Sequence, residues 1–259
     1  MQQAEIEINK DYKPSQQTIE LLKHLPEAFD AGKGELIYDE RNKLRRFVLD
    51  DGRHIIVKRY KKPNFFQTLS YSTFWENKAK KSYHFSLKLA EMGILTPMPV
   101  ACVTYKHNGL VSEYFYASEE VNGTECGIVL KNIRRERDQD KFDRYVRYIA
   151  ECFLNLHEKG FLHGDSNISN FICDESDGSV RISIIDINRS VFLPHPATYT
   201  ECVNNMQRIS NYEDIRYKLI TTYAKLRDWD AQKFLEDSNN AIATFYRRKE
   251  RIKKLKKIL

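Results

Sequence analysis

The sequence lacks the features of several protein classes. No apolar run in its 259 residues approaches the roughly 18 residues that a membrane-spanning helix requires. The first residues, MQQAEIEINKDYK, contain no apolar core of the kind found in signal peptides, so we expect a cytoplasmic protein. The five cysteines form no CxxC pair, which argues against a zinc site or a disulfide framework and fits a reducing compartment. With 41% hydrophobic and 30% charged residues, the chain suits a soluble globular protein.

Positive charge is concentrated at one end of the chain. The formal net charge is +6, and residues 246–259, YRRKERIKKLKKIL, contain eight Lys or Arg and one Glu, so the remainder is close to neutral. Two interpretations stay open for this tail. It is the solvated end of a helix, or it contacts an anionic surface such as a phosphorylated glycolipid, a membrane or a nucleic acid.

The most informative pattern is HGDSNISN at residues 163–170, followed by the strand-like run ISIIDI at residues 182–187. An Asp, an Asn five residues later and a second Asp after a hairpin-length gap form the phosphoryl-transfer site of kinase-like folds. In this pattern Asp165 orients a substrate hydroxyl and accepts its proton, while Asn170 and Asp186 hold Mg²⁺. Each residue alone is more often a turn former, so the prediction depends on the joint spacing.

The flanking segments match this interpretation. An apolar helix pattern from Tyr145 to Leu156 leads into Gly160, a candidate helix C-cap. After the motif, residues 171–187 read as a β-hairpin that ends on Asp186. We expect His163 to pack and hydrogen-bond in support of the loop rather than to act as a catalyst.

The first part of the chain is rich in strand patterns. Residues 34–39, 44–49 and 54–60 predict three antiparallel strands, and the third carries Lys58 after an apolar triplet. An ammonium at this position on the inner face of a kinase-like sheet pairs with the α and β phosphates of a nucleotide. The alternative is a solvent-facing lysine on an edge strand, which the neighbouring basic residues make credible.

The helix predicted over residues 72–92 occupies the position that supplies a Glu to this lysine in kinases. Glu76 lies near its start, whereas the positions nearer its middle hold Ser82 and His84. Three alternatives stay open: Glu76 pairs with Lys58, Lys58 pairs elsewhere, or the ion pair is absent.

The overall pattern predicts a two-lobed α+β protein-kinase-like fold, with an antiparallel sheet plus a helix in the N-lobe and a mostly helical C-lobe. A hairpin over residues 100–115 ends where the hinge should begin, so we place the N-lobe, with an N-terminal extension, at residues 1–115 and the C-lobe at 116–259. Further helices are predicted at residues 15–29, 200–211, 212–227, 230–238 and 239–257.

The chain departs from protein kinases in three motifs. The first strand turn has no GxGxxG, and the only glycines nearby are Gly32 and Gly34. Asp186 is not part of a DFG triplet, and no APE motif follows it. We therefore do not expect a protein kinase that is regulated by phosphorylation of an activation loop.

The HGD triplet, in place of HRD, resembles the kinase-like small-molecule and sugar kinases, among them the lipopolysaccharide core kinases that act on heptose or Kdo. Further segments resemble this last family: Arg41-Asn42, VKRYKKPN at 57–64, KAKKSY at 78–83, GILTPMPVA at 93–101 and IIDINR at 184–189. By this resemblance Lys58 contacts nucleotide phosphates, Asp165 is the catalytic residue, and Asn170 and Asp186 bind magnesium and nucleotide. Arg189 contacts an anionic acceptor or forms a structural ion pair.

The resemblance implies phosphorylation, with ATP and Mg²⁺, of a Kdo or heptose hydroxyl in the lipid A–core region of lipopolysaccharide. The acceptor would be an anionic glycolipid at the cytoplasmic face of the inner membrane, with peripheral contact through residues 246–259, and no nucleic acid partner is expected. Two alternatives stay open: a small-molecule or protein kinase of the same fold, and a pseudokinase that binds nucleotide or a partner without transferring phosphate.

Overall fold

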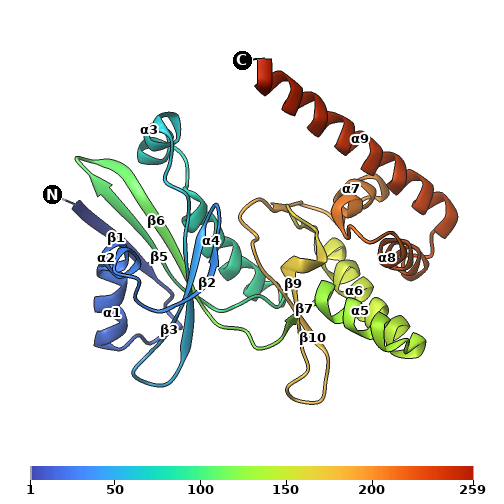
Figure 1. Ribbon diagram of the computed structural model, residues 1–259, viewed down its shortest axis with the longest axis horizontal. Coiled ribbons are helices and arrows are strands. Elements are labelled where there is room, and N and C mark those ends of the chain that lie inside the picture. The colour runs from blue at the N-terminus through green and yellow to red at the C-terminus, as the bar shows by residue number, and fades with distance from the viewer. Residues whose placement is uncertain (1, 259) are drawn as a thin grey trace. The chain divides into compact units, whose positions relative to one another are not determined.

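The structure is a computed structural model that describes residues 2–258, with the side chains of residues 3–254 (Figure 1). Leu259 and the side chains of residues 255–258, which belong to the predicted basic tail, lie outside this description. The chain divides into two compact units, one up to Val121 and one from Asn122 onward. Strand β6 continues to Glu119, so it crosses the lobe boundary that the sequence placed after residue 115.

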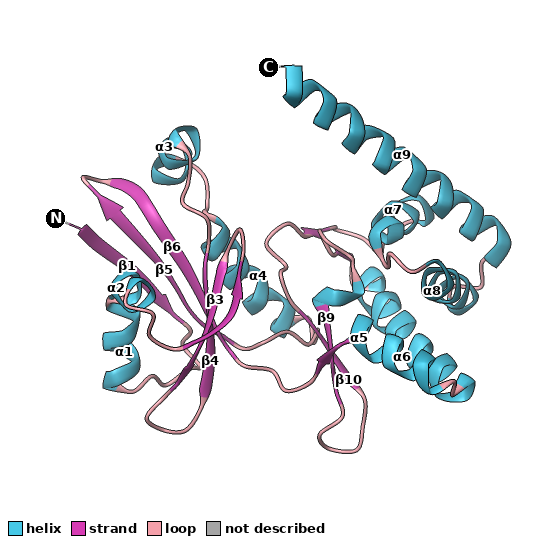
Figure 2. Ribbon diagram, viewed as in Figure 1, coloured by secondary structure: helices cyan, strands magenta, loops and turns pink. Residues whose placement is uncertain are grey.

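Unit 1 is built on a six-stranded antiparallel sheet with the order β1-β5-β6-β4-β3-β2 (Figure 2). In β1, Ile6 and Ile8 pack against the core cluster of one sheet face, and Glu7 on the other face pairs with residues of α4; no strand was predicted there from the sequence. The strands are β1 Gln2–Ile8, β2 Glu35–Asp39, β3 Lys43–Val48, β4 His54–Arg59, β5 Pro99–His107 and β6 Leu110–Glu119.

Helices cover both faces of this sheet. Helices α1 (Gln16–Lys23) and α2 (Leu25–Asp30) pack on one face, where Leu22 and Leu25 join a core cluster with Ile55 and Val57. Helix α4 (Lys78–Glu91) packs on the other face, where its Tyr83 joins a cluster with Tyr60 and Tyr114. Since side chains alternate along a strand, Lys58 points to the α4 side, opposite to Val57.

Two of the predicted helices are each interrupted in the structure. The helix predicted over residues 15–29 divides at His24, because Pro26 starts a new helix and cannot continue the old one. The helix predicted over residues 72–92 begins only at Lys78, because the side chain of Asn77 accepts hydrogen bonds from two main-chain amides of the first turn. Helix α3 (Phe65–Thr73) precedes it as a separate element.

Unit 2 is mostly helical. Its helices are α5 Cys126–Glu136, α6 Gln139–Glu158, α7 Tyr199–Asn205, α8 Glu213–Leu226 and α9 Ala231–Ile258. Its strands are β7 Thr124–Glu125, β8 Phe161–Leu162, β9 Phe171–Asp174, β10 Arg181–Ile184 and β11 Val191–Phe192, and short 3₁₀ turns lie at Ile168–Asn170 and Met206–Arg208. The strands form a three-stranded sheet, β10-β9-β7, and a two-stranded pair, β11-β8.

The core of unit 2 centres on α6 and aromatic side chains. Phe153 of α6 stacks on Phe171 of β9 with ring centroids 4.6 Å apart, which fixes the candidate loop on the helix. The two helices predicted over residues 230–257 form the single helix α9, whose Phe234 and Ser238 are buried against the rest of the unit. No described helix is both long and apolar enough to cross a membrane.

Candidate active site

The HGD segment leaves the short strand β8 and is held by the ring of His163. The Nδ1 atom of His163 accepts a hydrogen bond from the main-chain N–H of Asp165 at 3.1 Å, and Nε2 lies 2.9 Å from the carbonyl oxygen of Ile185. Because Nδ1 accepts, the proton resides on Nε2, which donates to Ile185. Burial lowers the pKa of His163, so the ring is neutral. His163 thus supports the loop, as predicted.

Asn170 and Asp186 are brought next to the HGD segment by hydrogen bonds. The Asn170 amide nitrogen donates to the carbonyl oxygen of Asp165 at 2.8 Å, and the carbonyl oxygen of Asn170 accepts from the N–H of Ile185 at 2.9 Å. Asp186 is the next residue after Ile185, and its backbone has a left-handed φ of 57°. Its Oδ1 accepts a hydrogen bond from the side chain of Asn188 at 2.7 Å. The β9–β10 hairpin therefore places two of the predicted ligands beside the predicted catalytic residue.

The carboxylate of Asp165 faces a single arginine. Its Oδ1 lies 3.2 Å from Nη1 of Arg208, in an ion pair whose geometry is not that of a hydrogen bond. This oxygen is buried and accepts no hydrogen bond from any described residue. A buried carboxylate oxygen without a donor is costly unless a further donor meets it.

Two residues that sequence reasoning missed support the loop from α7 and the turn after it. Asn205 donates from Nδ2 to the carbonyl oxygen of His163 at 2.9 Å, and its own carbonyl accepts from the hydroxyl of Ser166. Arg208 lies over the ring of Phe245 in α9, with its guanidinium carbon 5.5 Å from the ring centroid. The sequence places both residues in the polar segment NNMQR that follows Cys202 and Val203, and no motif marks either of them.

Gly164 is required by the packing of the segment after Asp186. A Cβ atom at this position would lie 2.3 Å from main-chain atoms of Arg189, too close for any side chain. The N–H of Gly164 also donates to the hydroxyl of Ser190 at 3.1 Å. The glycine of HGD therefore lets two main-chain segments meet directly, and the contact fixes where the chain runs after Asp186.

Lys58 belongs to unit 1. It lies on β4 opposite Leu44 and Tyr116 of the neighbouring strands, and its Nζ is 5.1 Å from the centroid of the Tyr60 ring. Two serines of α4 bond to tyrosines on this face of the sheet. Ser82 pairs with the hydroxyl of Tyr60 at 2.7 Å and Ser86 with that of Tyr116 at 2.8 Å.

Glu76 and His84, which the sequence analysis considered beside Ser82, contact each other. His84 lies 2.7 Å from Glu76 through Nδ1 and 3.1 Å from Glu7 through Nε2. Helix α4 thus directs His84 to acidic residues and turns Ser82 and Ser86 to the sheet. Of the two mid-helix positions named in the sequence analysis, Ser82 bonds to Tyr60 of the sheet, whereas His84 bonds to acidic side chains.

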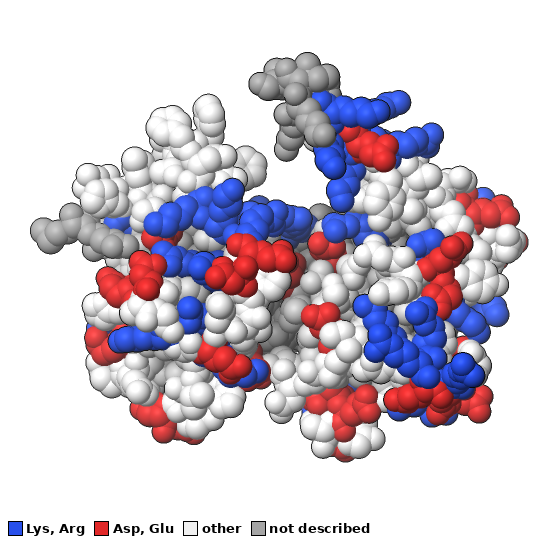
Figure 3. Space-filling view, viewed as in Figure 1, with Lys and Arg blue, Asp and Glu red and all other residues white. Residues whose placement is uncertain are grey.

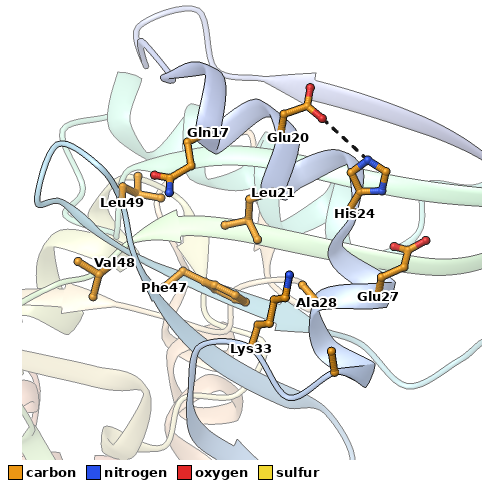
Figure 4. Close-up of a pocket in the computed structure, with 11 residues that line it drawn as sticks. Gln17, Glu20, Leu21, His24, Glu27, Ala28, Lys33, Phe47, Val48 and Leu49 are labelled. Atoms are coloured by element: carbon orange, nitrogen blue, oxygen red, sulfur yellow. Dashed lines mark ion pairs between the residues drawn. The ribbon is translucent and has the colours of Figure 1, made fainter.

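Each unit contains a cavity. A cavity of about 250 Å³ in unit 2 adjoins the HGD loop and is lined by residues that include Gly164, Ser166, Glu201, Asn205 and Arg208. A larger one of about 630 Å³ lies in unit 1 between α1, α2 and β3, where Figure 4 shows Lys33, Phe47 and the Glu20–His24 pair. The second contains none of the predicted site residues.

Metal-binding groups at the candidate site are few. Among the described residues, no three His, Cys, Asp or Glu side chains are grouped so that they could hold a metal ion. Mg²⁺ in nucleotide sites uses one or two carboxylates together with phosphate oxygens and water. Because Asn170 donates through its amide nitrogen, its oxygen remains available, and this oxygen and the carboxylate of Asp186 are hard ligands that suit Mg²⁺.

The antiparallel sheet with its helix, followed by a helical unit that carries the Asp165, Asn170 and Asp186 loop, defines a protein-kinase-like fold. Residues 39–235 match the model of the lipopolysaccharide kinase (Kdo/WaaP) family. The chain therefore belongs to this family, which confirms the resemblance and the predicted fold class. No curated protein matches the chain.

Solved structures with the same fold include WaaP in complex with acyl carrier protein. This structure shares 17% sequence identity with the chain at a TM-score of 0.60, covering 95% of this chain and 98% of the other. The pseudokinase domain of BIR2, an immune regulator of the RLK/Pelle family, shares 13% identity at a TM-score of 0.47, covering 92% and 90%.

Proposed function

We propose that the protein transfers the γ-phosphoryl group of ATP, with Mg²⁺, to a sugar hydroxyl in the lipid A–core region of lipopolysaccharide, on Kdo or heptose. Membership of the lipopolysaccharide kinase family supports the reaction class. The observation that carries the proposal is the hydrogen-bonded unit of Asp165 and Asn170, with Asp186 immediately after Ile185, because this reaction needs these groups close together.

In the proposed reaction, Asp165 orients the sugar hydroxyl and accepts its proton as the oxygen attacks the γ-phosphorus and the bond to the β-phosphate oxygen breaks. The side chain of Asp165 is 22% exposed, so part of it remains accessible for this task. His163 and Asn170 hold the main chain of Asp165 from two sides, so the carboxylate is oriented before substrate binds.

Asn170 and Asp186 would hold Mg²⁺, and Lys58 would contact the α and β phosphates. The bound ion would neutralise charge on the phosphates and on the leaving group. The left-handed backbone at Asp186, a conformation that costs energy in a residue with a side chain, is of the kind that persists at functional sites. The hydrogen bond from Asn188 restricts its carboxylate further.

The proposed acceptor is an anionic glycolipid at the cytoplasmic face of the inner membrane. The exposed basic residues of α9 support this location, since residues 246–254 include Arg247, Arg248, Lys249, Arg251, Lys253 and Lys254. Basic residues near an anionic surface each contribute about 1 kcal/mol of attraction. Together with the remaining tail residues, they would keep the enzyme near its acceptor.

A pseudokinase is the second candidate, favoured by one observation. Helix α4 has no glutamate before its last residue, Glu91, whereas kinases present a glutamate from this helix to the strand lysine. A protein of this kind would bind ATP without transferring phosphate.

The test is transfer of labelled phosphate from ATP to extracted lipopolysaccharide acceptors, measured together with binding of ATP. We expect the wild type to label the glycolipid, and Asp165→Asn and Asp186→Ala to abolish labelling. Asp177→Asn, a matched change in the exposed β9–β10 turn, should leave labelling of the glycolipid intact. ATP binding without labelling of glycolipid, free sugars or proteins would replace the kinase with the pseudokinase. Labelling of soluble acceptors alone would favour a small-molecule or protein kinase.

A further inference from the structure

Helix α3 and the turn after it expose an unusual set of large apolar side chains. None of the side chains of α3, all of which the structure describes, is buried. We call the α3 patch the five residues with the following exposed fractions: Phe65 76%, Phe66 79%, Leu69 52%, Phe74 90% and Trp75 65%. Monomeric soluble proteins rarely expose apolar residues in such a group, and a large patch usually marks an interaction surface.

Helix α3 is attached to the sheet through Tyr71 and Ser72, and Ser72 lies beside Phe65 on the helical wheel. Tyr71 packs edge-on against Tyr114 with ring centroids 5.8 Å apart, and the hydroxyl of Ser72 accepts a hydrogen bond from the N–H of Val111 at 2.9 Å. At about 100° per residue, Phe65, Phe66 and Leu69 lie within one 100° arc of the helix, away from Tyr71. The attachment therefore presents the aromatic side chains outward.

The start of the helix is also well defined. Asn64 accepts from the N–H of Gln67 at 2.9 Å, and the side chain of Gln67 accepts from the N–H of Asn64 at 3.1 Å, which together form a capping box. The rings of Phe65 and Phe66 contact each other edge to face at 5.8 Å. The exposed aromatics thus lie on an ordered element.

Positive charge flanks the patch. Residues 63–75 contain no charged residue, whereas Lys61 and Lys62 precede them and Lys78, Lys80 and Lys81 follow closely. Lys62 pairs with Glu113 and Lys80 with Glu7, and Glu76 is the single acidic residue between positions 58 and 81. Figure 3 shows uncharged side chains over α3 with a band of Lys and Arg beside them on unit 1.

We propose that the α3 patch inserts into the interfacial layer of a membrane that contains anionic lipids. A short helix with Phe and Leu on its free face, followed by an exposed Phe and Trp and bordered by lysines, has the composition of elements that lie in this layer. Aromatic rings are favoured at the level of the headgroups, where Trp75 also finds partners for its indole N–H. The exposed Lys61 and Lys62 meet the negative headgroups, so charge and apolar surface select the same partner.

This contact is separate from the basic tail and does not depend on the transfer reaction. Residues 246–259 would approach the membrane by charge alone, whereas the α3 patch supplies apolar surface that enters it. A vesicle assay without nucleotide therefore tests the proposal even if the proposed kinase activity fails.

The experiment is co-sedimentation of the full chain with vesicles of equal parts phosphatidylglycerol and phosphatidylcholine, compared with vesicles of phosphatidylcholine alone. We expect binding to the anionic vesicles that weakens with salt. The triple variant Phe65→Ser, Phe66→Ser, Phe74→Ser should lower the partition coefficient at least about tenfold, because the apolar area that enters the lipid is lost. Its unfolding temperature should stay close to that of the wild type, since these side chains are exposed.

The matched control replaces exposed apolar residues elsewhere, with Val48→Ser and Tyr217→Ser, and should bind like the wild type. Tryptophan emission gives an independent signal, because Trp75 and Trp229 are the two tryptophans of the chain. Vesicles should shift the emission to the blue in the wild type, and Trp75→Phe should still bind yet lose this shift.

Three results would overturn the proposal. In the first, the triple variant binds vesicles like the wild type. In the second, removal of residues 246–259 abolishes all binding although the patch is intact. In the third, the wild type self-associates in the absence of lipid and the triple variant does not, which would assign the patch to a second copy of the chain.

Discussion

The side-chain amide of Asn170 donates a hydrogen bond to the main-chain carbonyl of Asp165, with 2.8 Å between nitrogen and oxygen. This bond ties a proposed metal ligand to the residue proposed to accept the proton. It also decides the orientation of the amide, because the nitrogen faces Asp165 and the oxygen must face away. A single residue thus fixes the loop and offers a ligand.

Replacement of Asn170 should therefore affect both roles. We expect Asn170→Ala to lower kcat about 100-fold or more, within the range for loss of a positioned group, and to raise the Mg²⁺ concentration needed for half-maximal rate. Measurement of the rate against Mg²⁺ tests this. Asn240→Ala, an exposed change on α9, is the control. An unchanged Mg²⁺ requirement in Asn170→Ala would remove Asn170 from the proposed ligands.

Arg208 should act through Asp165. The guanidinium is 3.2 Å from Oδ1 of Asp165, so Arg208→Gln removes the cation that faces this carboxylate. We expect kcat to fall about tenfold while the Kd for ATP stays within about twofold, since Arg208 contacts Asp165 and not the proposed phosphate ligands. The comparison is with Arg134→Gln, which breaks the exposed ion pair with Asp214. Equal losses in the two variants would contradict a role at Asp165.

Acid should destabilise unit 2 through His157. Burial lowers the pKa of His157 to about 4, and its ring is held neutral between Tyr223 and Asn205. The unfolded chain takes up a proton below a pH of about 6.5, and the folded chain does so only near pH 4. His157 therefore makes its full contribution to the free energy of unfolding above a pH of about 6.5. As the pH falls towards 4, this contribution decreases by about 3 kcal/mol.

Urea unfolding at a series of pH values measures this loss. His157→Gln keeps one donor and one acceptor but cannot be protonated, so its stability should fall less between pH values of about 6.5 and 4. Carboxylates titrate in both proteins, so their contributions to the pH dependence of stability cancel in the comparison. Parallel pH curves for the wild type and His157→Gln would show that His157 does not control the acid response.

Gly164→Ala should damage the loop through sterics. Its Cβ would lie 2.3 Å from the main chain of Arg189, so the two segments must separate, at a cost of about 1–3 kcal/mol in unfolding free energy. Phosphate transfer should fall as well, because the segment that contains Arg189 also carries Asp186. Gly127→Ala is the control, since its Cβ meets only side-chain atoms of Ile168 at 3.7 Å and beyond, and the main-chain nitrogen of Ser169 at 3.9 Å. Thermal unfolding of both variants provides the test.

The sequence by itself determined the class of fold and the order of the predicted site residues. The strand that carries Lys58, the helix before HGD and the hairpin shortly before Asp186 are local patterns, in which period and turn residues lie close together in the chain. The spacing from Asp165 to Asn170 is equally local, so the chain's own residues suffice to recognise it. Pro26 and Asn77 are residue types that start helices, so the sequence also contains the signals for both breaks. The apolar periodicity of these segments nevertheless predicts continuous helices.

The tertiary structure alone decided which residues support the site. Asn205 reaches the carbonyl of His163 across 42 positions of the chain, and Arg208 meets Asp165 across a similar separation. Which α4 residues face the sheet was decided by packing, because the helix had to bury Tyr83 beside Tyr60 and so turned Ser82 and Ser86 inward. Such pairings depend on how elements dock, and no local pattern encodes them.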